Sequence, residues 1–393
     1  MIVREAYHVL ANRLDNEERK FIQILVGPRQ VGKTTIIQQY LEKATTSYLT
    51  VSADEVGFID DLWLEKHWNI ARIKCQINGK FLLVVDEVQN ISNWSSRVKK
   101  LWDEDTRLKQ NIKIVLLGSS RLLIQNGLSE SLAGRFEKIY VGHWSYTEVF
   151  EAFEVSENQY AWFGSYPGSI SLIPDEKRWK SYIQSSIIDT VIKKDILQLT
   201  RVLKPMLLEN LFYLGCQYSG QILSYNKIVG QLQDAGNTTT LTHYLSLLSS
   251  SGVLSGIEKY SGGYINRRHS SPKFMVQNTA FIGATSKYSY SEAHSTPDQW
   301  GRVVESCVGA HFINYSYSED FKVFYWRENN DEVDFVLEYH GRCIAIEVKS
   351  STQRTKNGMT AFVKAFSPDR VYAISESGLS WKDIIKINPT ILF

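Results

Sequence analysis

In the first part of the chain, short and largely apolar runs alternate with stretches of helical periodicity. These runs fall at residues 21–26, 81–85 and 112–120, and two further strand-like runs fall at 47–55 and 138–142. The run at 81–85 is fully apolar, which is typical of strands that are buried on both faces of a sheet. Alternation of such strands with helices predicts an α/β fold, with five parallel strands in a three-layer sandwich.

Beyond this region the periodicity becomes helical. Residues 146–155 and 178–199 are amphipathic, and a turn cluster, FGSYPGS, separates them. The pattern predicts an α/β core over 1–145 and a helical lid or linker over 146–215.

Residues 216–275 have the pattern of a winged helix. Ser224 is placed to cap one helix, and Thr238 or Thr239 to cap the next, after which a hairpin follows. A DNA reader should carry its contacts on the second helix, yet residues 238–250 contain no Lys or Arg. Arg267, Arg268 and His269 on the hairpin are candidate phosphate contacts. The missing basic side chains favour a structural linker over a DNA-binding module.

Length and composition narrow the class of protein. The chain has 393 residues, 43% hydrophobic and 22% charged, with a net charge of +2. This length predicts two or three domains, and the small net charge argues against a dominant basic face. The four cysteines are far apart in sequence, and no apolar run approaches the length of a signal peptide core or a membrane span. We therefore expect a cytoplasmic protein with no membrane partner.

A phosphate-binding loop is the most specific motif. GPRQVGKT follows the strand at 21–26 and precedes a helix, which is the GxxxxGK[ST] pattern in its required context. Glycines let successive backbone N–H groups surround an anion at the positive end of the helix. Lys33 is placed to reach the β- and γ-phosphates, and Thr34 to hold Mg²⁺. The predicted cofactor-binding residues are Gly27, Pro28, Arg29, Gln30, Val31, Gly32, Lys33, Thr34 and Thr35.

Two further strand ends carry candidate chemistry. The run at 81–85 ends in Asp86 and Glu87. Asp86 is the predicted magnesium-side carboxylate, and Glu87 the base that activates the attacking water. The third strand ends in Ser119 and Ser120, either of which is a candidate γ-phosphate sensor, although simple strand-end capping explains the pair equally well.

The motifs together resemble a known family. GPRQVGKTT, LLVVDEVQN, IVLLGSSRLLI and ESLAGRF resemble, in order and spacing, the AAA-type ATPase domain of a large bacterial and archaeal family whose members carry a C-terminal domain with a restriction-endonuclease-like core. The resemblance implies ATP as the nucleotide. It also implies that Arg135, in the LAGR stretch, is an arginine finger. Arg121 is the competing candidate, and a surface ion pair with Glu130 or Glu137 is the structural alternative.

Arginine fingers usually act on a neighbouring subunit, so this assignment implies a homo-oligomer.

The last domain, predicted over 276–393, contains DEVDFVLEYHGRCIAIEVKS, two strand-like runs joined by a His-Gly turn. An Asp near a strand start followed by Glu-x-Lys on its hairpin partner resembles restriction-endonuclease-like nucleases. The resemblance implies Mg²⁺ or Mn²⁺ held by Asp334 and Glu347, with Lys349 acting on the attacking water and Glu305 as an additional acid. The alternative is a set of ordinary salt bridges on a sheet face.

These observations predict Mg²⁺-dependent ATP binding and hydrolysis, coupled to a C-terminal nuclease-like domain that acts on DNA. The alternative is an ATP-controlled switch that binds DNA or protein and whose nuclease-like domain no longer cleaves.

Overall fold

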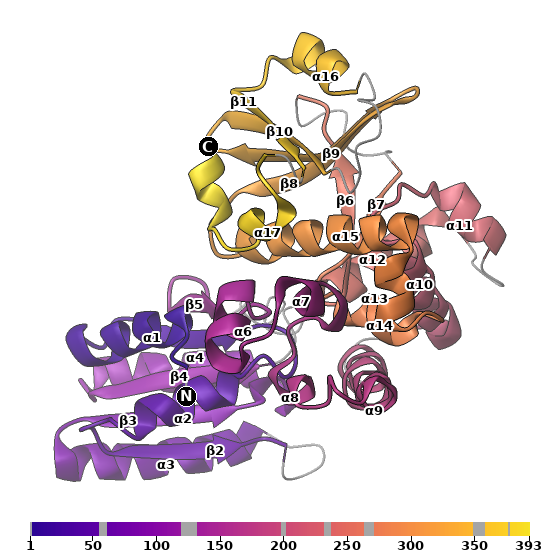
Figure 1. Cartoon of the computed structure of the whole chain (residues 1–393). Helices are drawn as coiled ribbons and strands as arrows, with labels where there is room; N and C mark the ends of the chain where they lie inside the picture. The colour runs from indigo at the N-terminus through magenta and orange to yellow at the C-terminus, as the bar shows by residue number, and fades with distance from the viewer. Residues whose placement is uncertain are drawn as a thin grey trace. The chain divides into compact units, whose positions relative to one another are not determined.

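The computed structural model describes residues 2–54, 61–118, 132–197, 202–231, 237–262, 271–348, 358–375 and 378–393. The chain divides into two compact units, Met1–Val141 and Gly142–Phe393, which Figure 1 shows in indigo to magenta and in magenta to yellow. In the described ranges, no helix has both the length and the apolar character needed to cross a membrane.

The first unit contains a five-stranded parallel sheet with the order β2-β3-β4-β1-β5. Its strands are β1 (Ile22–Val26), β2 (Tyr48–Ser52), β3 (Phe81–Asp86), β4 (Ile112–Gly118) and β5 (Phe136–Tyr140). Its described helices are α1 (Glu5–Asn16), α2 (Lys33–Leu41), α3 (Asp61–Asn78), η1 (Val88–Asn90) and α4 (Trp94–Arg107).

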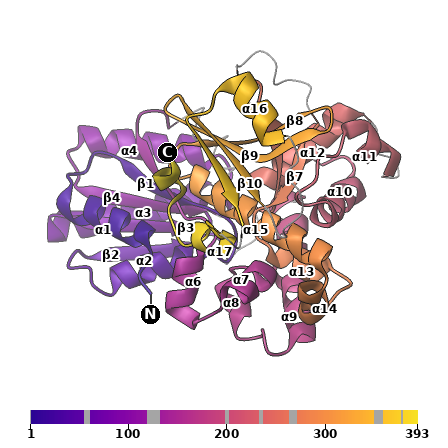
Figure 2. The same cartoon turned by 45° about the horizontal axis from the view of Figure 1, so that its top comes forward.

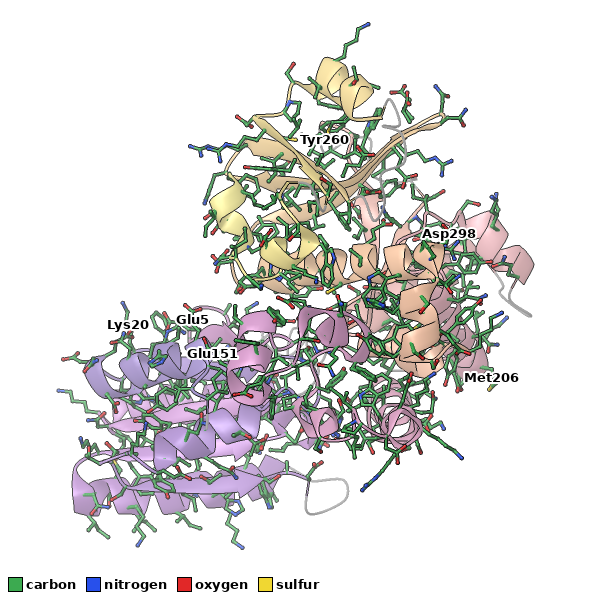
Figure 3. The ribbon with its side chains drawn as sticks, in the orientation of Figure 1. Glu5, Lys20, Glu151, Met206, Tyr260 and Asp298 are labelled. Atoms are coloured by element: carbon green, nitrogen blue, oxygen red, sulfur yellow. The ribbon has the colours of Figure 1, made fainter. Side chains whose placement is uncertain are left out.

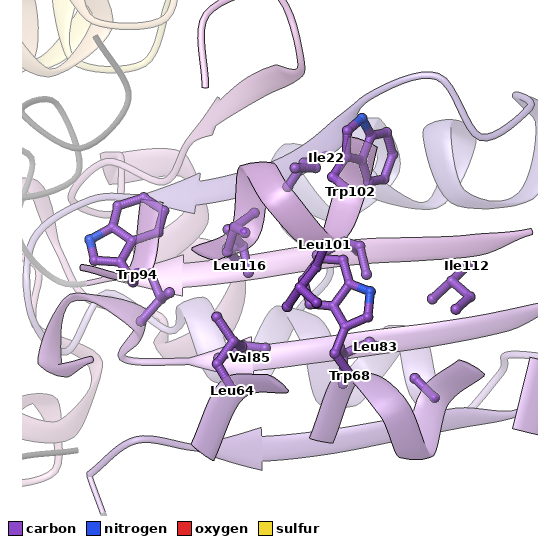
Figure 4. Close-up of a cluster of buried hydrophobic side chains, with 14 of the residues drawn as sticks. Ile22, Leu64, Trp68, Leu83, Val85, Trp94, Leu101, Trp102, Ile112 and Leu116 are labelled. Carbon is purple, nitrogen blue, oxygen red and sulfur yellow. The ribbon is translucent and has the colours of Figure 1, made fainter. Parts of the chain in front are cut away.

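Helices cover both faces of this sheet. One apolar cluster joins alternate residues of the sheet, among them Leu83 and Val85, to Trp68 of α3 and Trp94 of α4, and Figure 4 shows these side chains interleaved. A second cluster packs the other residues of the same strands against α1 and α2. Because β1 and β3 are buried on both faces, nearly every position of these strands is apolar. The three-layer arrangement with five parallel strands is confirmed.

The described helices of the second unit lie before, between and after the strands of its sheet. These are α6 (Tyr146–Phe153), α7 (Glu157–Phe163), α8 (Pro167–Ile170), α9 (Glu176–Tyr182), the π-helical turns η2 (Ile183–Ile188) and η3 (Val191–Ile196), α10 (Pro205–Gln217), α11 (Tyr225–Gln231), α12 (Thr238–Ser250), α13 (Ala280–Thr285), α14 (Tyr290–Ser295), α15 (Pro297–Ser316), α16 (Gly358–Phe366), α17 (Trp381–Ile384) and η4 (Pro389–Leu392).

A six-stranded mixed sheet organises this unit, with the order β11-β10-β9-β8-β6-β7. Its strands are β6 (Leu254–Lys259), β7 (Lys273–Val276), β8 (Lys322–Glu328), β9 (Asp331–Tyr339), β10 (Arg342–Val348) and β11 (Arg370–Ile374). Strands β8, β9 and β10 are antiparallel neighbours, and β11 joins β10 in parallel through α16. Figure 2 shows α16 and α15 on opposite sides of these strands.

Aromatic side chains attach both helices to the sheet. Phe312 of α15 meets Phe335 of β9 with ring centroids 5.5 Å apart. On the other side, Tyr260, labelled in Figure 3, packs against Phe362 and Phe366 of α16 at 5.8 and 5.2 Å. Buried rings of this size contribute much of the apolar area of such a core.

Strands β6 and β8 pair in parallel, through Glu258 with Phe324 and Lys259 with Tyr325. The hairpin expected at the end of the winged-helix pattern therefore belongs to the same sheet as the C-terminal strands. The division of residues 142–393 at 215/216 and 275/276 stays a prediction, as does the description of its parts as lid, winged helix and nuclease-like domain.

The predicted His-Gly turn between β9 and β10 is present. His340 has φ 48° and Gly341 has φ 79°. Two successive positive φ values make the tight turn whose twist matches a β-hairpin. The turn fixes the register, which pairs Ile346 with Phe335.

Candidate functional site

The loop between β1 and α2 forms a close backbone turn. A Cβ atom at Gly27 would lie 1.9 Å from the carbonyl oxygen of Val141, so no other residue fits there without movement of the backbone. Gln30 and Gly32 have positive φ values of 56° and 93°. This conformation leads directly into the N-terminus of α2 at Lys33, where the first backbone N–H groups of a helix and its dipole favour an anion.

Lys33 lies folded over this loop. Its ammonium group donates hydrogen bonds to the carbonyl oxygens of Gly27, at 2.9 Å, and Pro28, at 2.7 Å. Both of these partners are neutral, and the charge of Lys33 also acts on the Glu87 carboxyl, whose pKa it works to lower. A phosphate group entering the loop would meet this charge.

Thr34 and Asp86 come together although 52 positions separate them. The Thr34 hydroxyl donates to Asp86 Oδ2 at 2.9 Å, and the backbone N–H of Glu87 donates to Asp86 Oδ1 at 2.8 Å. A hydroxyl and a carboxylate at the carboxyl end of β3 are hard oxygen ligands of the kind that Mg²⁺ prefers. The two residues fit the predicted magnesium site.

Glu87 occupies a special backbone position at the end of β3. Its φ is 51°, and it precedes the short helix η1. A non-glycine residue in this conformation is unusual and clusters at functional sites. Burial raises the pKa of the Glu87 carboxyl, while a hydrogen bond from the Gln89 amide and the charge of Lys33 act in the opposite direction. A raised pKa suits a group that must accept a proton near neutral pH.

A pocket of about 360 Å³ opens beside Thr34 and Asp86. Tyr48 and Thr50 of β2 and Ile37 of α2 border it. Ligands in open parallel sheets bind at the carboxyl ends of the strands. The pocket reaches that edge at Thr34 and Asp86 and extends from there along α2 to Tyr48, the first residue of β2.

Two residues that the sequence reasoning missed support the site. Arg4 is buried, and its guanidinium donates to the carbonyl oxygen of Val31 within the loop at 2.9 Å. Gln89 orients the Glu87 carboxylate. Arg4 directly precedes an amphipathic helix and belongs to no motif, so nothing in the sequence indicated its role. Gln89 lies two positions after Glu87 and was within reach of the motif analysis.

The candidate sensor and finger residues lie apart from this group. Ser119, Ser120 and Arg121 are outside the described residues. Arg135 forms a two-pronged ion pair with Asp103 of α4, at 2.7 and 3.1 Å. This is a surface ion pair of the kind given as the structural alternative, with Asp103 as the partner; Glu130 lies outside the described residues.

Arg135 also lies at the wrong end of the sheet for its own nucleotide. Its carbonyl oxygen accepts from the N–H of Ile22, the first residue of β1, whereas Gly27 follows the last. Five strand residues separate the two ends, roughly 16 Å at about 3.3 Å per residue. Within one chain, Arg135 does not reach the phosphate loop.

In the second unit, two of the predicted nuclease residues, Glu305 and Asp334, contact a lysine that the sequence reasoning missed. The Lys273 ammonium is fully buried and lies 2.6 Å from Glu305 Oε1, 3.5 Å from Asp334 Oδ1 and 3.5 Å from Glu332 Oε1. We call these four residues the Lys273 cluster. A charged residue in the strand KFMV, whose every position is buried, was the available signal.

The charges of the Lys273 cluster affect one another strongly. Burial is the largest influence on Lys273 and lowers its pKa, but the three carboxylates together raise the pKa above its ordinary value. Burial raises the pKa of Glu305, and Lys273 only partly offsets this because Asp334 and Glu332 act with burial. One ammonium therefore faces an excess of carboxylates.

Asp334 and Glu347, the predicted metal ligands, lie at neighbouring positions of the hairpin. Asp334 Oδ2 accepts from the Val348 N–H at 2.8 Å, and the register brings Glu347 level with Asp334, one step beyond the pair Ile346 and Phe335. Lys349 lies outside the described residues. In those that are described, no group of three or more His, Cys, Asp or Glu side chains is placed to hold a metal ion. Where a second metal ion was expected, Glu305 and Asp334 instead face the Lys273 ammonium, and the metal-binding role of Asp334 and Glu347 stays a prediction.

Three family models match successive parts of the chain. Residues 19–150 match a model described as AAA domain. Residues 156–292 match "Domain of unknown function (DUF8612)", and residues 300–389 match "Domain of unknown function (DUF4143)". Neither of the latter descriptions assigns a nuclease fold or activity.

Several curated proteins are similar over most of their length. An uncharacterized protein of Haemophilus influenzae is 23% identical over 382 residues, covering 91% of this chain and 90% of that protein. One from Methanocaldococcus jannaschii is 22% identical over 343 residues, covering 80% and 72%, and one from Mycobacterium tuberculosis is 24% identical over 341 residues, covering 84% and 70%.

A solved structure titled "Structural Basis for Katanin Self-Assembly" matches 46% of this chain and 69% of its own, at 14% identity and a TM-score of 0.32, which is too low to support an argument. The family model is more specific, because it covers the phosphate loop, Asp86 and Glu87. The match and the geometry around Thr34 together support an AAA-type P-loop ATPase for the first part of this chain.

Proposed function

We propose that the first unit binds ATP with Mg²⁺ and hydrolyses it. The observation that carries this proposal is the 2.9 Å contact between the Thr34 hydroxyl and the Asp86 carboxylate, at the end of a loop in which Gly27 permits no side chain. Two Mg²⁺ ligands and an anion-binding loop lie at one edge of one sheet. ATP is proposed rather than another nucleotide on the basis of the AAA domain match.

Each residue then has a defined role. Backbone N–H groups of residues 29–35 and the Lys33 ammonium bind the β- and γ-phosphates. Mg²⁺, held by Thr34 and Asp86, would offset phosphate charge. The Glu87 carboxylate, oriented by Gln89, takes a proton from the water that attacks the γ-phosphorus.

The test compares Glu87→Gln with Lys33→Ala. Glu87→Gln should bind ATP as the wild type does and hydrolyse it ~10²–10⁴-fold more slowly, because only the base is lost. Lys33→Ala should lose ATP affinity as well. Glu18→Gln, an exposed acid of the same unit, is the matched control. Normal hydrolysis by Glu87→Gln would remove Glu87 as the base.

Arg135 is proposed to act on the nucleotide of a second copy of the chain. Its distance from its own phosphate loop supports action between subunits, and its ion pair with Asp103 would have to open. The Arg135→Ala variant should hydrolyse ATP more slowly than the wild type. Mixing it with Lys33→Ala should restore activity at the mixed interfaces, where one subunit supplies Lys33 and the other Arg135. No restoration in the mixture would argue for a purely structural ion pair.

For the second unit, the Lys273 cluster favours the binding switch over the nuclease. Metal-dependent cleavage by Glu305, Asp334, Glu347 and Lys349 needs carboxylates that are available to Mg²⁺ or Mn²⁺, and Lys273 holds two of them. We propose that ATP binding and hydrolysis control association with DNA or a protein partner. The winged-helix pattern, whose helix α12 lacks Lys and Arg, favours a protein partner.

The nuclease alternative has a direct test. Purified protein would be incubated with plasmid and branched DNA, Mg²⁺ or Mn²⁺, with and without ATP. The switch predicts no cleavage. Nicking that Asp334→Ala abolishes would establish the nuclease instead.

A further inference from the structure

The Lys273 cluster is assembled from three elements of the second unit. Lys273 begins β7, Glu305 lies in α15, and Glu332 and Asp334 lie in β9. The Lys273 side chain has no exposure to solvent, whereas each acid retains some. Burial of an ammonium group is costly unless charged partners surround it, so its position is specified by the three carboxylates.

The carboxylates converge on the ammonium and have further partners. Besides the Val348 N–H, Asp334 contributes its backbone carbonyl oxygen, 3.3 Å from Lys273 Nζ. Glu332 Oε2 lies 4.0 Å from the Arg327 guanidinium. These contacts hold the acids toward a point that already carries a positive charge.

The space around Glu305 is also limited. Gly220, with φ +82°, lies so close that a Cβ atom there would be 3.3 Å from the Glu305 carboxyl carbon. A divalent ion needs ligand oxygens at about 2.0–2.6 Å in an ordered shell. The Lys273 ammonium, 2.6 Å from Glu305, occupies the place where such an ion would have to bind.

We propose that Lys273 is a tethered cation that replaces a divalent metal ion in the second unit, so that this unit folds and works without a metal at the cluster. The inference deepens the proposed binding switch and rests on it for its biological role. It explains why acids typical of a metal site persist without an open coordination position: they hold Lys273, and Lys273 joins β7 to α15 and β9.

The first experiment measures divalent ions on the nucleotide-free full chain, where the ATPase site lacks the phosphate ligands that complete its metal shell. Mn²⁺ would be titrated into wild type and Asp334→Asn by calorimetry and electron paramagnetic resonance. We expect no Mn²⁺ binding that depends on Asp334. Wild-type binding that Asp334→Asn abolishes would overturn the proposal.

The second experiment removes the charge of the tethered cation. Lys273→Met keeps most of the side-chain length, and its Tm should fall by roughly 10 °C, because breaking a buried ion pair leaves uncompensated charge. Millimolar Mn²⁺ should recover part of this loss, since the freed acids gain a cation. Lys364→Met, an exposed lysine of α16, should leave Tm within about 2 °C of the wild type.

If Lys273→Met does not fold, the double variant Lys273→Met/Glu305→Gln removes one charge of each sign and should recover soluble protein. A Tm of Lys273→Met equal to that of the wild type would overturn the proposal. ATP hydrolysis by the same proteins is a separate readout: the proposed ATPase fails if the wild type does not hydrolyse ATP, whatever the metal titration shows.

Discussion

Each unit of this protein places a buried lysine beside acidic residues, and the two lysines have different partners. Lys33 donates to the neutral carbonyl oxygens of Gly27 and Pro28, while Asp86 bonds a hydroxyl and a backbone N–H. Lys273 instead contacts the carboxylates themselves. In the first arrangement these hydrogen bonds of the cation and of the acid go to uncharged groups, which a ligand of opposite charge can replace. In the second, one ammonium is held among three carboxylates.

The comparison teaches which observation separates a binding site from a structural ion pair. Both sites contain acids near a strand end and a lysine, so residue type alone does not distinguish them. The partner of the lysine does. A cation held by neutral oxygens can turn to a phosphate group at little electrostatic cost, whereas a cation held by buried carboxylates leaves uncompensated charge when it moves.

The largest expected effect is a difference between the two lysines under the same substitution. Lys33→Met should mainly reduce ATP hydrolysis, and Lys273→Met should mainly reduce stability. Lys33→Met should lower the ATP hydrolysis rate ~100-fold or more and the free energy of unfolding by about 1–2 kcal/mol. Lys273→Met should lower the free energy of unfolding by about 3–5 kcal/mol. The Lys273→Met variant keeps every residue that is proposed to contact phosphate and metal. At temperatures where this variant is folded, it should therefore hydrolyse ATP much faster than Lys33→Met. Hydrolysis assays and denaturant unfolding measure both quantities, and equal stability losses would break the comparison.

The glycines at the two sites extend the comparison. A side chain at Gly27 would collide with the Val141 backbone, so Gly27→Ala should displace the loop and lower ATP affinity by about tenfold, the equivalent of about 1.4 kcal/mol. Gly220→Ala should lower the Tm of the second unit, because its φ of +82° is strained for alanine and its Cβ would press on Glu305. Gly230→Ala, with open space around it, is the control for both. Calorimetric ATP binding and thermal unfolding distinguish the two outcomes.

The influence of Gln89 on the pKa of Glu87 can be tested by substitution. Its hydrogen bond lowers the pKa of Glu87, against the raising effect of burial. Gln89→Leu should therefore move the acidic limb of the kcat profile to higher pH, because hydrolysis needs Glu87 deprotonated and is lost as pH falls through its pKa. At neutral pH we expect a loss of about tenfold. Glu87→Gln should show no such limb, and an unchanged profile in Gln89→Leu would mean that Gln89 does not tune the base.

Local sequence accounts for the first site better than for the second. The apolar runs predicted β1 and β3, and one contiguous motif predicted the loop, since each of these features is specified by residues adjacent in the chain. The contact of Thr34 with Asp86 followed because parallel strands end at the same edge. The hairpin of β9 and β10 was equally predictable, because its turn residues lie between its strands.

Long-range packing accounts for what was missed. Lys273 meets Asp334 across 61 positions of sequence, and β6 pairs with β8 across a comparable gap. No local pattern records such contacts. A lysine in an otherwise apolar strand predicts a buried partner, but not that its partners are the acids expected to hold a metal.

The smallest expected effect concerns Arg4, which, like Lys33, donates to a neutral carbonyl oxygen of the phosphate loop. Its guanidinium donates to the Val31 carbonyl oxygen from the start of α1. Arg4→Met should raise the KM for ATP about three- to tenfold, since one hydrogen bond contributes about 0.5–1.5 kcal/mol to the position of the loop. Arg13→Met, which removes an ion pair with Glu137 away from the loop, should leave KM unchanged. If both variants raise KM equally, the general stability of the first unit, and not the Arg4 contact, holds the loop. The contrast between the neutral partners of the loop and the charged partners of Lys273 would then have no functional meaning.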